Sequence, residues 1–479
     1  METEGIIPLH LLLATAAKVL CSAVFLSGRE EAEALRHSAF HALQMHHLPD
    51  VLLPLVQVET DRPAREVTLR LRLDAGSVKG IVAGYRASYP DLEGDWAGEA
   101  ARLLRLGTVA RTARFLGDQG SVILRRGDAR LFFTPVEVRS ALPDASLMPW
   151  PMGDVTGLRN PRIDAAIRTA LADQAACTVA AVVLHKGALV GEGYAPGFSA
   201  DTQLESWSMG KSLTATLIGR LVQDGLLTLD QPAPIAAWQH PDDPRGRITI
   251  RDLLQMSSGL RFSGHHDPRN TWPGYVPEHF YIYTEAIDVF DFAISRPAEF
   301  PPQTVGRYRN CDPLSLGYIA KQIVTTRLGE EYLTWPQRAL FDRIGIRRQV
   351  LETDLYGNFL LTGFDYGTAR NWARLGQLYL QAGMWEGNRL LPAGWSDFVS
   401  EPGAAWDQPI YGGQFWLNRT SEWALPTDAY MMAGSGQQRV FIVPSADLVV
   451  VRMGHVCAHS HAAPSINAML REVLAGLAG

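Results

Sequence analysis

The sequence predicts an α+β protein whose larger domain contains an antiparallel sheet flanked by helices. Two pairs of apolar strand patterns, each joined by a short turn, support the sheet: 178–184 with 188–194, and 439–443 with 448–453. Turns of a few residues make both pairs antiparallel. Because one pair lies early and the other near the C-terminus, we expect one sheet assembled from both ends of this domain.

Helical patterns fill much of the remaining sequence. The last of them, 465–477, carries one apolar stripe at helical spacing: Ile466, Met469, Leu470, Val473 and Leu474. Another is expected to begin at Ser208 and end at Gly225, and a third covers 368–382. We therefore expect helices to cover the sheet, and the long middle of the chain to form a mostly helical lobe.

The N-terminal part is predicted to be an extra α/β module. Residues 66–73 alternate apolar and polar, which is typical of a strand with one wet face, and a second strand pair is expected at 121–124 and 131–134. Residues 142–154 are rich in proline and lack periodicity, which indicates a linker. The predicted organisation is an accessory module of unknown role at 1–141, a linker at 142–154 and the main domain at 155–479.

Composition excludes several classes of protein. The chain has 479 residues, a net charge of −6 and no run rich in Lys and Arg, so we expect no nucleic-acid partner. The four cysteines form no CxxC motif and are expected to be isolated reduced thiols: Cys21, Cys177, Cys311 and Cys457.

The apolar segment 6–26 is a candidate signal or membrane anchor. Glu2 and Glu4 precede it without any basic residue, which contradicts a secretory signal, and His10 and Lys18 interrupt it. A buried N-terminal helix is favoured over an anchor. We therefore favour a cytoplasmic location, while membrane association stays an open alternative.

Lysine is scarce in this chain, which draws attention to Lys211. Only five of the 44 basic residues are lysine, and Lys211 alone has a serine three positions before it, in Ser208-Met209-Gly210-Lys211. Ser-x-x-Lys is the signature of a serine nucleophile activated by lysine, because a desolvated lysine loses its proton more easily and can act as a base. The simpler alternative is a serine helix cap followed by a surface lysine.

Two further segments favour the catalytic interpretation. Tyr308-Arg309-Asn310 offers a phenol that can relay a proton and an amide that can bond the lysine amine or a substrate. Gly434-Ser435-Gly436-Gln437 precedes a strand, where a backbone N–H can point at an oxyanion. Taken singly, Tyr-x-Asn is common by chance, and the second segment can be a loop that simply needs glycine.

In this order and spacing, the three motifs resemble the serine hydrolases related to class C β-lactamases and penicillin-binding proteins. The resemblance runs from about residue 154 to the C-terminus and includes the surroundings of the motifs: Trp207-Ser208-Met209-Gly210-Lys211-Ser212, Asp252-Leu253-Leu254-Gln255-Met256-Ser257-Ser258-Gly259-Leu260 and Tyr411-Gly412-Gly413-Gln414-Phe415-Trp416. It implies a two-lobed β-lactamase-like transpeptidase fold with the site between the lobes. The N-terminal module lies outside it.

The resemblance also implies residue roles. Ser208 would attack a carbonyl and form an acyl-enzyme, Lys211 and Tyr308 would share the general-base role, and Asn310 would orient the lysine or the substrate. The backbone N–H groups of Ser208 and Gln437 would form the oxyanion hole. Four residues are expected to line the substrate site: Trp207, Gly434, Ser435 and Gly436. No cofactor or metal is implied.

One departure from the family pattern bears on the substrate. β-Lactamases of this kind usually carry Lys-Thr-Gly as a third motif, whereas this chain has Gly434-Ser435-Gly436 and no lysine after Lys321. The pattern therefore favours the esterases, amidases and 6-aminohexanoate-dimer hydrolases of the family, acting on a small ester or amide. Alternatives are a β-lactamase, with Arg439 as a carboxylate contact, or a penicillin-binding or sensor protein without turnover.

Other motifs carry less weight. The segment from His455 to His461 has the composition of a metal site but no standard ligand spacing. His265-His266-Asp267 could line the cleft, although a solvated loop explains it better. The sequence contains no Gly-x-Ser-x-Gly elbow, P-loop or dinucleotide-binding fingerprint.

Overall fold

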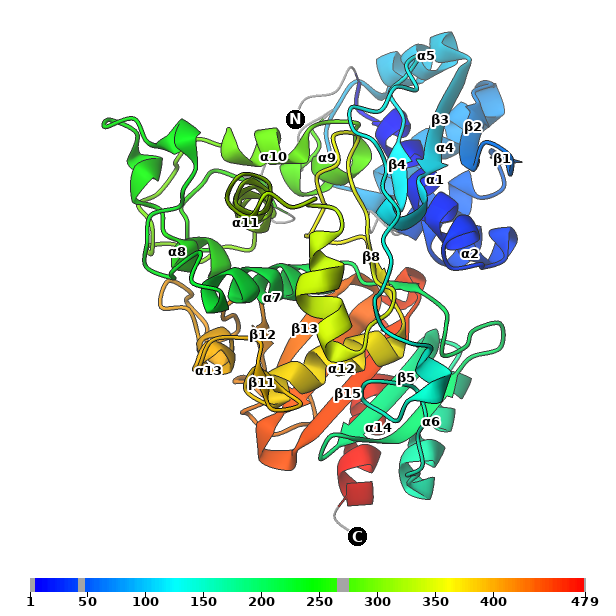
Figure 1. Ribbon diagram of the computed structural model, residues 1–479. Coiled ribbons are helices and arrows are strands. Elements are labelled where there is room, and N and C mark those ends of the chain that lie inside the picture. Colours follow the sequence, from blue (N-terminus) through cyan, green and yellow to red (C-terminus); the bar gives the residue numbers. More distant parts are fainter. Residues whose placement is uncertain (1–4, 42–47, 265–274, 478–479) are drawn as a thin grey trace. The chain divides into compact units, whose positions relative to one another are not determined.

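The computed structural model describes residues 5–41, 48–264 and 275–477, and the chain folds as two units (Figure 1). The first unit contains residues 1–135, 262–289 and 353–357, and the second contains 136–261, 290–352 and 358–479. The domain boundaries expected at residues 142 and 155 stay a prediction, because the first unit also includes the later segments 262–289 and 353–357.

The first unit is built on a four-stranded antiparallel sheet in the order β1-β2-β3-β4. Its strands are β1 (Val56–Asp61), β2 (Glu66–Arg72), β3 (Thr108–Phe115) and β4 (Ser121–Ile123). Helix α1 (Leu9–Phe25) contacts β2, β3 and β4 and is buried along most of its length. The apolar N-terminal segment is therefore a core helix, as predicted. Within the ranges the structure describes, no helix combines the length and apolar character that crossing a bilayer requires.

The first unit has several further helices and a core drawn from three stretches of sequence. The helices are α2 (Glu31–His37), α3 (Leu48–Leu52), α4 (Ala75–Ser88), α5 (Trp96–Leu106) and α9 (Glu278–Thr284). One hydrophobic cluster joins Ala14 of α1 and Val122 of β4 to Ala286 and Leu355. The two later segments therefore complete a core that the N-terminal residues begin.

The predicted hairpin of 121–124 with 131–134 is wrong in its second strand. β4 pairs instead with β3, with Ala113 opposite Ile123, and residues 131–134 form no strand. Phe132 donates its backbone N–H to Leu355 O at 2.9 Å and stacks on the Tyr356 ring. The backbone of 131–134 thus bonds to a segment more than 200 residues away in sequence rather than to β4.

The second unit contains a six-stranded antiparallel sheet in the order β12-β13-β14-β15-β5-β6 (Figure 1). Its strands are β5 (Thr178–His185), β6 (Ala188–Tyr194), β12 (Trp416–Leu417), β13 (Tyr430–Gly434), β14 (Gln438–Val443) and β15 (Leu448–Gly454). β15 pairs with β5, with Val450 opposite Val183. Both predicted hairpins and the single sheet assembled from both ends of the domain are confirmed.

Helices cover both faces of this sheet. α6 (Pro161–Ala172) and α14 (Ala463–Leu477) pack together on the face that buries Val183 and Val450. α12 (Ala369–Leu380) contacts the opposite face, since a Cβ on its Gly376 would lie 2.7 Å from Val449, and neighbouring strand residues point to opposite sides. This arrangement confirms the α+β fold class.

The remaining elements of the second unit surround α7 (Met209–Gln223), which contacts both α11 and β13. The helices are α8 (Ile250–Leu254), α10 (Val289–Ile294), α11 (Cys311–Gln322) and α13 (Trp395–Ser400). Two small sheets consist of β7 (Leu204–Glu205), β9 (Asp365–Gly367) and β8 (Val350–Leu351), and of β10 (Met384–Trp385) with β11 (Asn388–Arg389). In the first of these small sheets, β7 lies just before α7 in sequence and pairs with β9, which ties the start of that helix to a distant segment.

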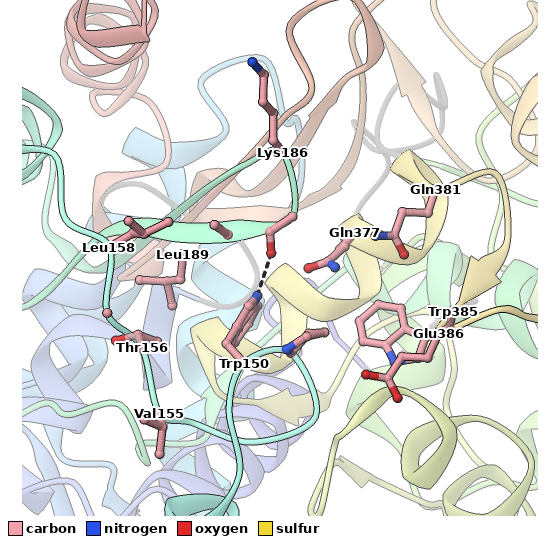
Figure 2. Close-up of a pocket in the computed structure, with 14 residues that line it drawn as sticks. Trp150, Val155, Thr156, Leu158, Lys186, Leu189, Gln377, Gln381, Trp385 and Glu386 are labelled. Atoms are coloured by element: carbon pink, nitrogen blue, oxygen red, sulfur yellow. Dashed lines mark hydrogen bonds between the residues drawn. The ribbon is translucent and has the colours of Figure 1, made fainter.

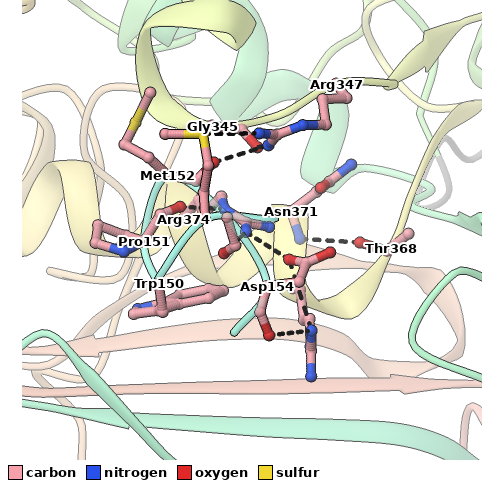
Figure 3. Close-up of polar contacts among 12 residues, drawn as sticks. Trp150, Pro151, Met152, Asp154, Gly345, Arg347, Thr368, Asn371 and Arg374 are labelled. Carbon is pink, nitrogen blue, oxygen red and sulfur yellow. Dashed lines mark hydrogen bonds and ion pairs between the residues drawn. The ribbon is translucent and has the colours of Figure 1, made fainter. Parts of the chain in front are cut away.

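The segment predicted as a linker is fastened to α12 (Figure 3). Arg374 of α12 donates to Pro151 O, Gly153 O and Asp154 Oδ1, each at 2.7 Å. Arg347 donates to Met152 O at 2.8 Å. Arg374 is only 2 % exposed, so these hydrogen bonds satisfy the donors of a buried, positively charged side chain.

Candidate functional site

The turn before α7 presents Ser208 at the start of a buried helix. Ser206 donates its N–H to Asp365 O at 2.8 Å, which ties the turn to β9. Trp207 has a φ of +47°, a strained value for a non-glycine residue, and its buried ring packs 4.9 Å from that of Phe364. Ser208 itself stays partly exposed, and its hydroxyl caps no backbone N–H of α7. The strained turn therefore leaves Ser208 Oγ available for chemistry.

Lys211 lies directly beneath that hydroxyl. Its Nζ is 3.2 Å from Ser208 Oγ and 2.8 Å from Thr362 O, and 4.7 Å from the centre of the Tyr308 ring. The side chain is 1 % exposed. This burial holds the pKa of Lys211 well below its usual value, with the nearby Asp365 carboxyl acting in the opposite direction. The amine therefore lies within hydrogen-bond reach of the hydroxyl, and its burial favours the neutral form.

Asp365 is a neighbour of the site that the sequence did not reveal. Its carboxyl faces Gly210, where a Cβ would lie only 1.9 Å from Asp365 Oδ2. Asp365 and Glu352 are both fully buried, and burial together with the Glu352 charge raises the pKa of Asp365 well above its usual value. In the sequence, Asp365 stands out only as a single acidic residue within the apolar run 359–366.

Tyr308 completes the group around Ser208. The side chains of Tyr308 and Ser208 are hydrogen-bonded, and the Tyr308 ring packs against both Tyr411 (5.8 Å between centres) and Trp416 (5.4 Å). Burial raises the pKa of Tyr308, although the Ser208 hydrogen bond and the Arg439 charge act against it. The phenol is therefore neutral near pH 7, which suits a proton relay better than a standing phenolate.

The glycine-rich turn approaches the nucleophile closely. A Cβ on Gly434, the last residue of β13, would lie 2.1 Å from Ser206 O and 3.1 Å from Ser208 N. Gly436 and Gln437 follow with φ values of +75° and +58°. Only glycine at position 434 leaves room beside the Ser208 N–H, so this end of β13 lies directly against the start of α7.

Basic and histidine side chains support this turn. Arg439 donates from its two terminal nitrogens to Gly434 O at 3.1 Å and to Gln437 Oε1 at 2.5 Å, which ties its guanidinium to the turn. Burial lowers the pKa of Arg439 to about 10. His459 Nδ1 accepts the Gly436 N–H at 2.9 Å. One histidine of the 455–461 segment therefore acts as a structural brace.

The other predicted residues take the following places. Asn310 is fully buried immediately before α11, the helix that packs against α7. Ser435 is partly exposed in the turn after β13. Residues 265–267 lie outside the described part of the chain. The structure thus brings Ser208, Lys211 and Tyr308 into direct contact and places Gly434 beside them.

None of the predicted site residues lines a cavity of about 520 Å³ in the second unit (Figure 2). Trp150, Gln377 and Trp385 are among the side chains that line it, and Trp150 Nε1 donates to Gly187 O at 3.0 Å. It contains no nucleophile with an adjacent base. The chemistry is therefore expected at Ser208 rather than in this cavity.

Known proteins share this fold and sequence pattern. A 6-aminohexanoate-dimer hydrolase of Paenarthrobacter ureafaciens is 23% identical over 299 residues, which cover 58% of this chain and 72% of that protein. A Bacillus anthracis structure with a provisional assignment as a 6-aminohexanoate-dimer hydrolase aligns with a TM-score of 0.57 at 19% identity, over 72% of this chain and 92% of that one. A penicillin-binding protein homologue of Caulobacter crescentus aligns with a TM-score of 0.50 at 17% identity, over 67% and 100%.

The family follows from a match to more than half of the chain. The model of the family described as Beta-lactamase matches residues 163–456, a range that holds the Ser208 turn, the segment before α11 and the Gly434 turn. The solved structures agree with it in fold. The chain therefore belongs to the Beta-lactamase family.

Proposed function

We propose that this protein is a serine hydrolase that cleaves a small ester or amide through an acyl-enzyme on Ser208. The observation that carries the proposal is the buried Lys211 amine 3.2 Å from a partly exposed serine hydroxyl. Burial lowers the pKa of Lys211, which favours the neutral amine that a general base requires.

In the acylation half, Ser208 Oγ attacks the substrate carbonyl carbon while its proton passes to Lys211 Nζ. The carbonyl oxygen becomes an oxyanion and accepts hydrogen bonds from the backbone N–H groups of Ser208 and Gln437. The C–O or C–N bond to the leaving group then breaks, and the leaving group takes a proton from Lys211 by way of the Tyr308 phenol. The product is a Ser208 ester.

In the deacylation half, a water molecule attacks the acyl carbon and gives a proton through Tyr308 to Lys211. Collapse of the second oxyanion breaks the bond to Oγ, returns a proton to Ser208 and releases the acid. Asn310 orients the lysine amine or the substrate, and four residues border the acyl group: Trp207, Gly434, Ser435 and Gly436.

The substrate class rests on the third motif. Gly434-Ser435-Gly436 offers no lysine to a β-lactam carboxylate, and Arg439 is bonded to the turn itself. A 6-aminohexanoate-dimer hydrolase, whose name describes hydrolysis of a dimer, is among the relatives. Together these observations support linear esters and amides over β-lactams.

The test is hydrolysis of a p-nitrophenyl ester by the full-length protein. Ser208→Ala should lower kcat by roughly 10⁴-fold or more, as removal of a serine nucleophile does in other hydrolases. Lys211→Arg should be almost as damaging, because arginine keeps the charge but cannot accept a proton. Ser295→Ala and Lys186→Arg, two exposed positions, are the matched controls and should be unchanged.

The opposite results identify which part of the proposal fails. Full turnover by Ser208→Ala means that another group is the nucleophile. Near-normal turnover by Lys211→Arg means that Lys211 is structural. Efficient hydrolysis of nitrocefin by the native protein replaces the proposed substrate class with β-lactams.

A further inference from the structure

Two cysteines that are far apart in sequence meet behind the glycine-rich turn. Cys177 lies just before β5, and Cys457 lies in the short 3₁₀ turn Val456–Ala458 after β15. Their Sγ atoms are 3.7 Å apart, and His455 donates its N–H to Cys177 O at 3.0 Å. Both side chains are partly exposed. Since a disulfide bond is about 2.05 Å long, closing it requires an approach of roughly 1.7 Å.

The surroundings make Cys177 the reactive member of the pair. The Cys457 thiol donates a hydrogen bond to it, and the buried Arg452 guanidinium adds positive charge, so the pKa of Cys177 is lowered to about 7. A thiolate is the form that attacks disulfides. The remaining cysteines, Cys21 and Cys311, are fully buried and serve as internal controls.

Arg452 and His459 connect this pair to the turn beside Ser208. Arg452 Nη1 donates to Gly436 O at 2.6 Å, while its Nε donates to Thr178 Oγ1 at 3.1 Å and its Nη2 to Ala176 O, on either side of Cys177. His459, two residues after Cys457, accepts hydrogen bonds from the Gly436 N–H and from the Gln437 side-chain amide. Movement of either cysteine is therefore transmitted to residues 436–437.

We propose that Cys177 and Cys457 form a reversible disulfide that displaces the Gly434–Gln437 turn and slows hydrolysis at Ser208. The oxidant is a small-molecule disulfide such as oxidised glutathione. The Cys177 thiolate attacks one of its sulfurs and expels one glutathione thiolate. Cys457 then loses its proton to water and attacks Cys177 Sγ, which expels the second. Two cysteines are oxidised by two electrons, and one disulfide is reduced to two thiols.

The effect on activity follows from the precision that an oxyanion hole requires. Its donors act at 2.7–3.1 Å, and a displacement of about 1 Å in an active site can cost roughly 10²-fold in rate. We expect the oxidised protein to hydrolyse esters at least about tenfold more slowly, and a thiol reductant to restore the rate. This regulatory part rests on the proposed function.

The experiment treats the full-length protein with oxidised glutathione and measures three quantities. Peptide mapping after thiol alkylation should find a 177–457 cross-link, with Cys21 and Cys311 alkylated only after unfolding. Hydrogen exchange of the peptide that covers 434–438 should change on oxidation, and the p-nitrophenyl ester rate should fall. Cys177→Ser and Cys457→Ser should each keep the basal rate and lose the response to oxidant.

The outcomes separate this inference from the proposed function. A map without the 177–457 cross-link at saturating oxidant overturns the inference. A cross-link that changes neither the exchange of 434–438 nor the ester rate overturns the connection to the turn. If Ser208→Ala retains turnover, the proposed function fails, while the cross-link and the exchange measurement still decide whether the dithiol closes and moves the turn.

Discussion

Gly210 and Asp365 form a matched pair, and we expect Gly210→Ala to be harmful only while Asp365 is present. Gly210 is the second residue of α7, and a methyl group there would lie 1.9 Å from Asp365 Oδ2, 3.1 Å from its Cγ and 3.3 Å from Gly363 N. Favourable contact between heavy atoms begins near about 3.5 Å. The Asp365 carboxyl, the helix start or β9 must therefore move by more than about 1 Å.

Two opposing effects determine how much Gly210→Ala changes the unfolding free energy. Alanine is better than glycine inside a helix by about 1 kcal/mol, whereas overpacking a buried site costs about 1–3 kcal/mol. Asp365 cannot withdraw easily, because β9 is paired with β7 on one side and β8 on the other. We expect Gly210→Ala to lose about 1–2 kcal/mol of unfolding free energy, and ester turnover to fall by about tenfold or more as the Ser208 turn shifts.

The sign should reverse once the carboxyl is removed. In an Asp365→Ala background the 1.9 Å clash is gone and only the 3.3 Å approach to Gly363 N opposes the helix preference, so Gly210→Ala should stabilise the protein by up to about 1 kcal/mol. Urea unfolding of the four proteins of this cycle, with turnover measured in parallel, gives the coupling directly. Gly80→Ala in α4 is the control, since its nearest neighbour atom would be 3.6 Å away. Equal effects of Gly210→Ala in both backgrounds would refute the packing argument.

Three further predictions concern the site. Lys211→Met should abolish turnover yet raise stability at pH 7: the folded pKa of Lys211 lies below the unfolded one, so the unfolded chain binds more protons, and the gain should shrink as urea midpoints are followed toward about pH 10.4. Tyr308→Phe should lower kcat by roughly 10²-fold with little change in KM, because it removes only a proton relay; an unchanged kcat would exclude that role. Gly434→Ala should lower kcat/KM for the ester by about tenfold or more, since its methyl group would lie 3.1 Å from Ser208 N; native kinetics would show that the turn does not border the reacting carbonyl.

Local patterns predicted most of the sheet, because its strands are apolar and their turns are short. The hairpins at 178–194 and 439–453 needed no information beyond their own residues. Residues 131–134 show the opposite case. Their partner, Leu355, is more than 200 residues away, and nothing in the local pattern distinguishes that pairing from a hairpin.

The site residues likewise divide into those that local sequence could predict and those that depend on the tertiary fold. Ser208 and Lys211 are one helical turn apart, so their contact could be predicted from spacing, whereas Tyr308 and the Gly434 turn were weak candidates singly and gained weight only from their order along the chain and the resemblance built on it. Asp365 was missed because its role depends on which face of β9 is buried against α7. The Cys177–Cys457 contact contradicts the expectation of isolated thiols, since it arises only when β15 pairs with β5.

The core of the first unit has a consequence for biosynthesis. Its cluster joins Ala14 and Val122 to Ala286 and Leu355, so the ribosome must deliver most of the chain before that core can close. Helix α1 can pack on β2, β3 and β4 early, but the surface that meets Ala286 and Leu355 stays uncovered until those residues are made, so folding of this unit cannot finish strictly from the N-terminus. Chaperone depletion should harm this protein more than a family member without the N-terminal module, and a fragment that starts at residue 155 should leave Ala286 and Leu355 without partners and accumulate as aggregate.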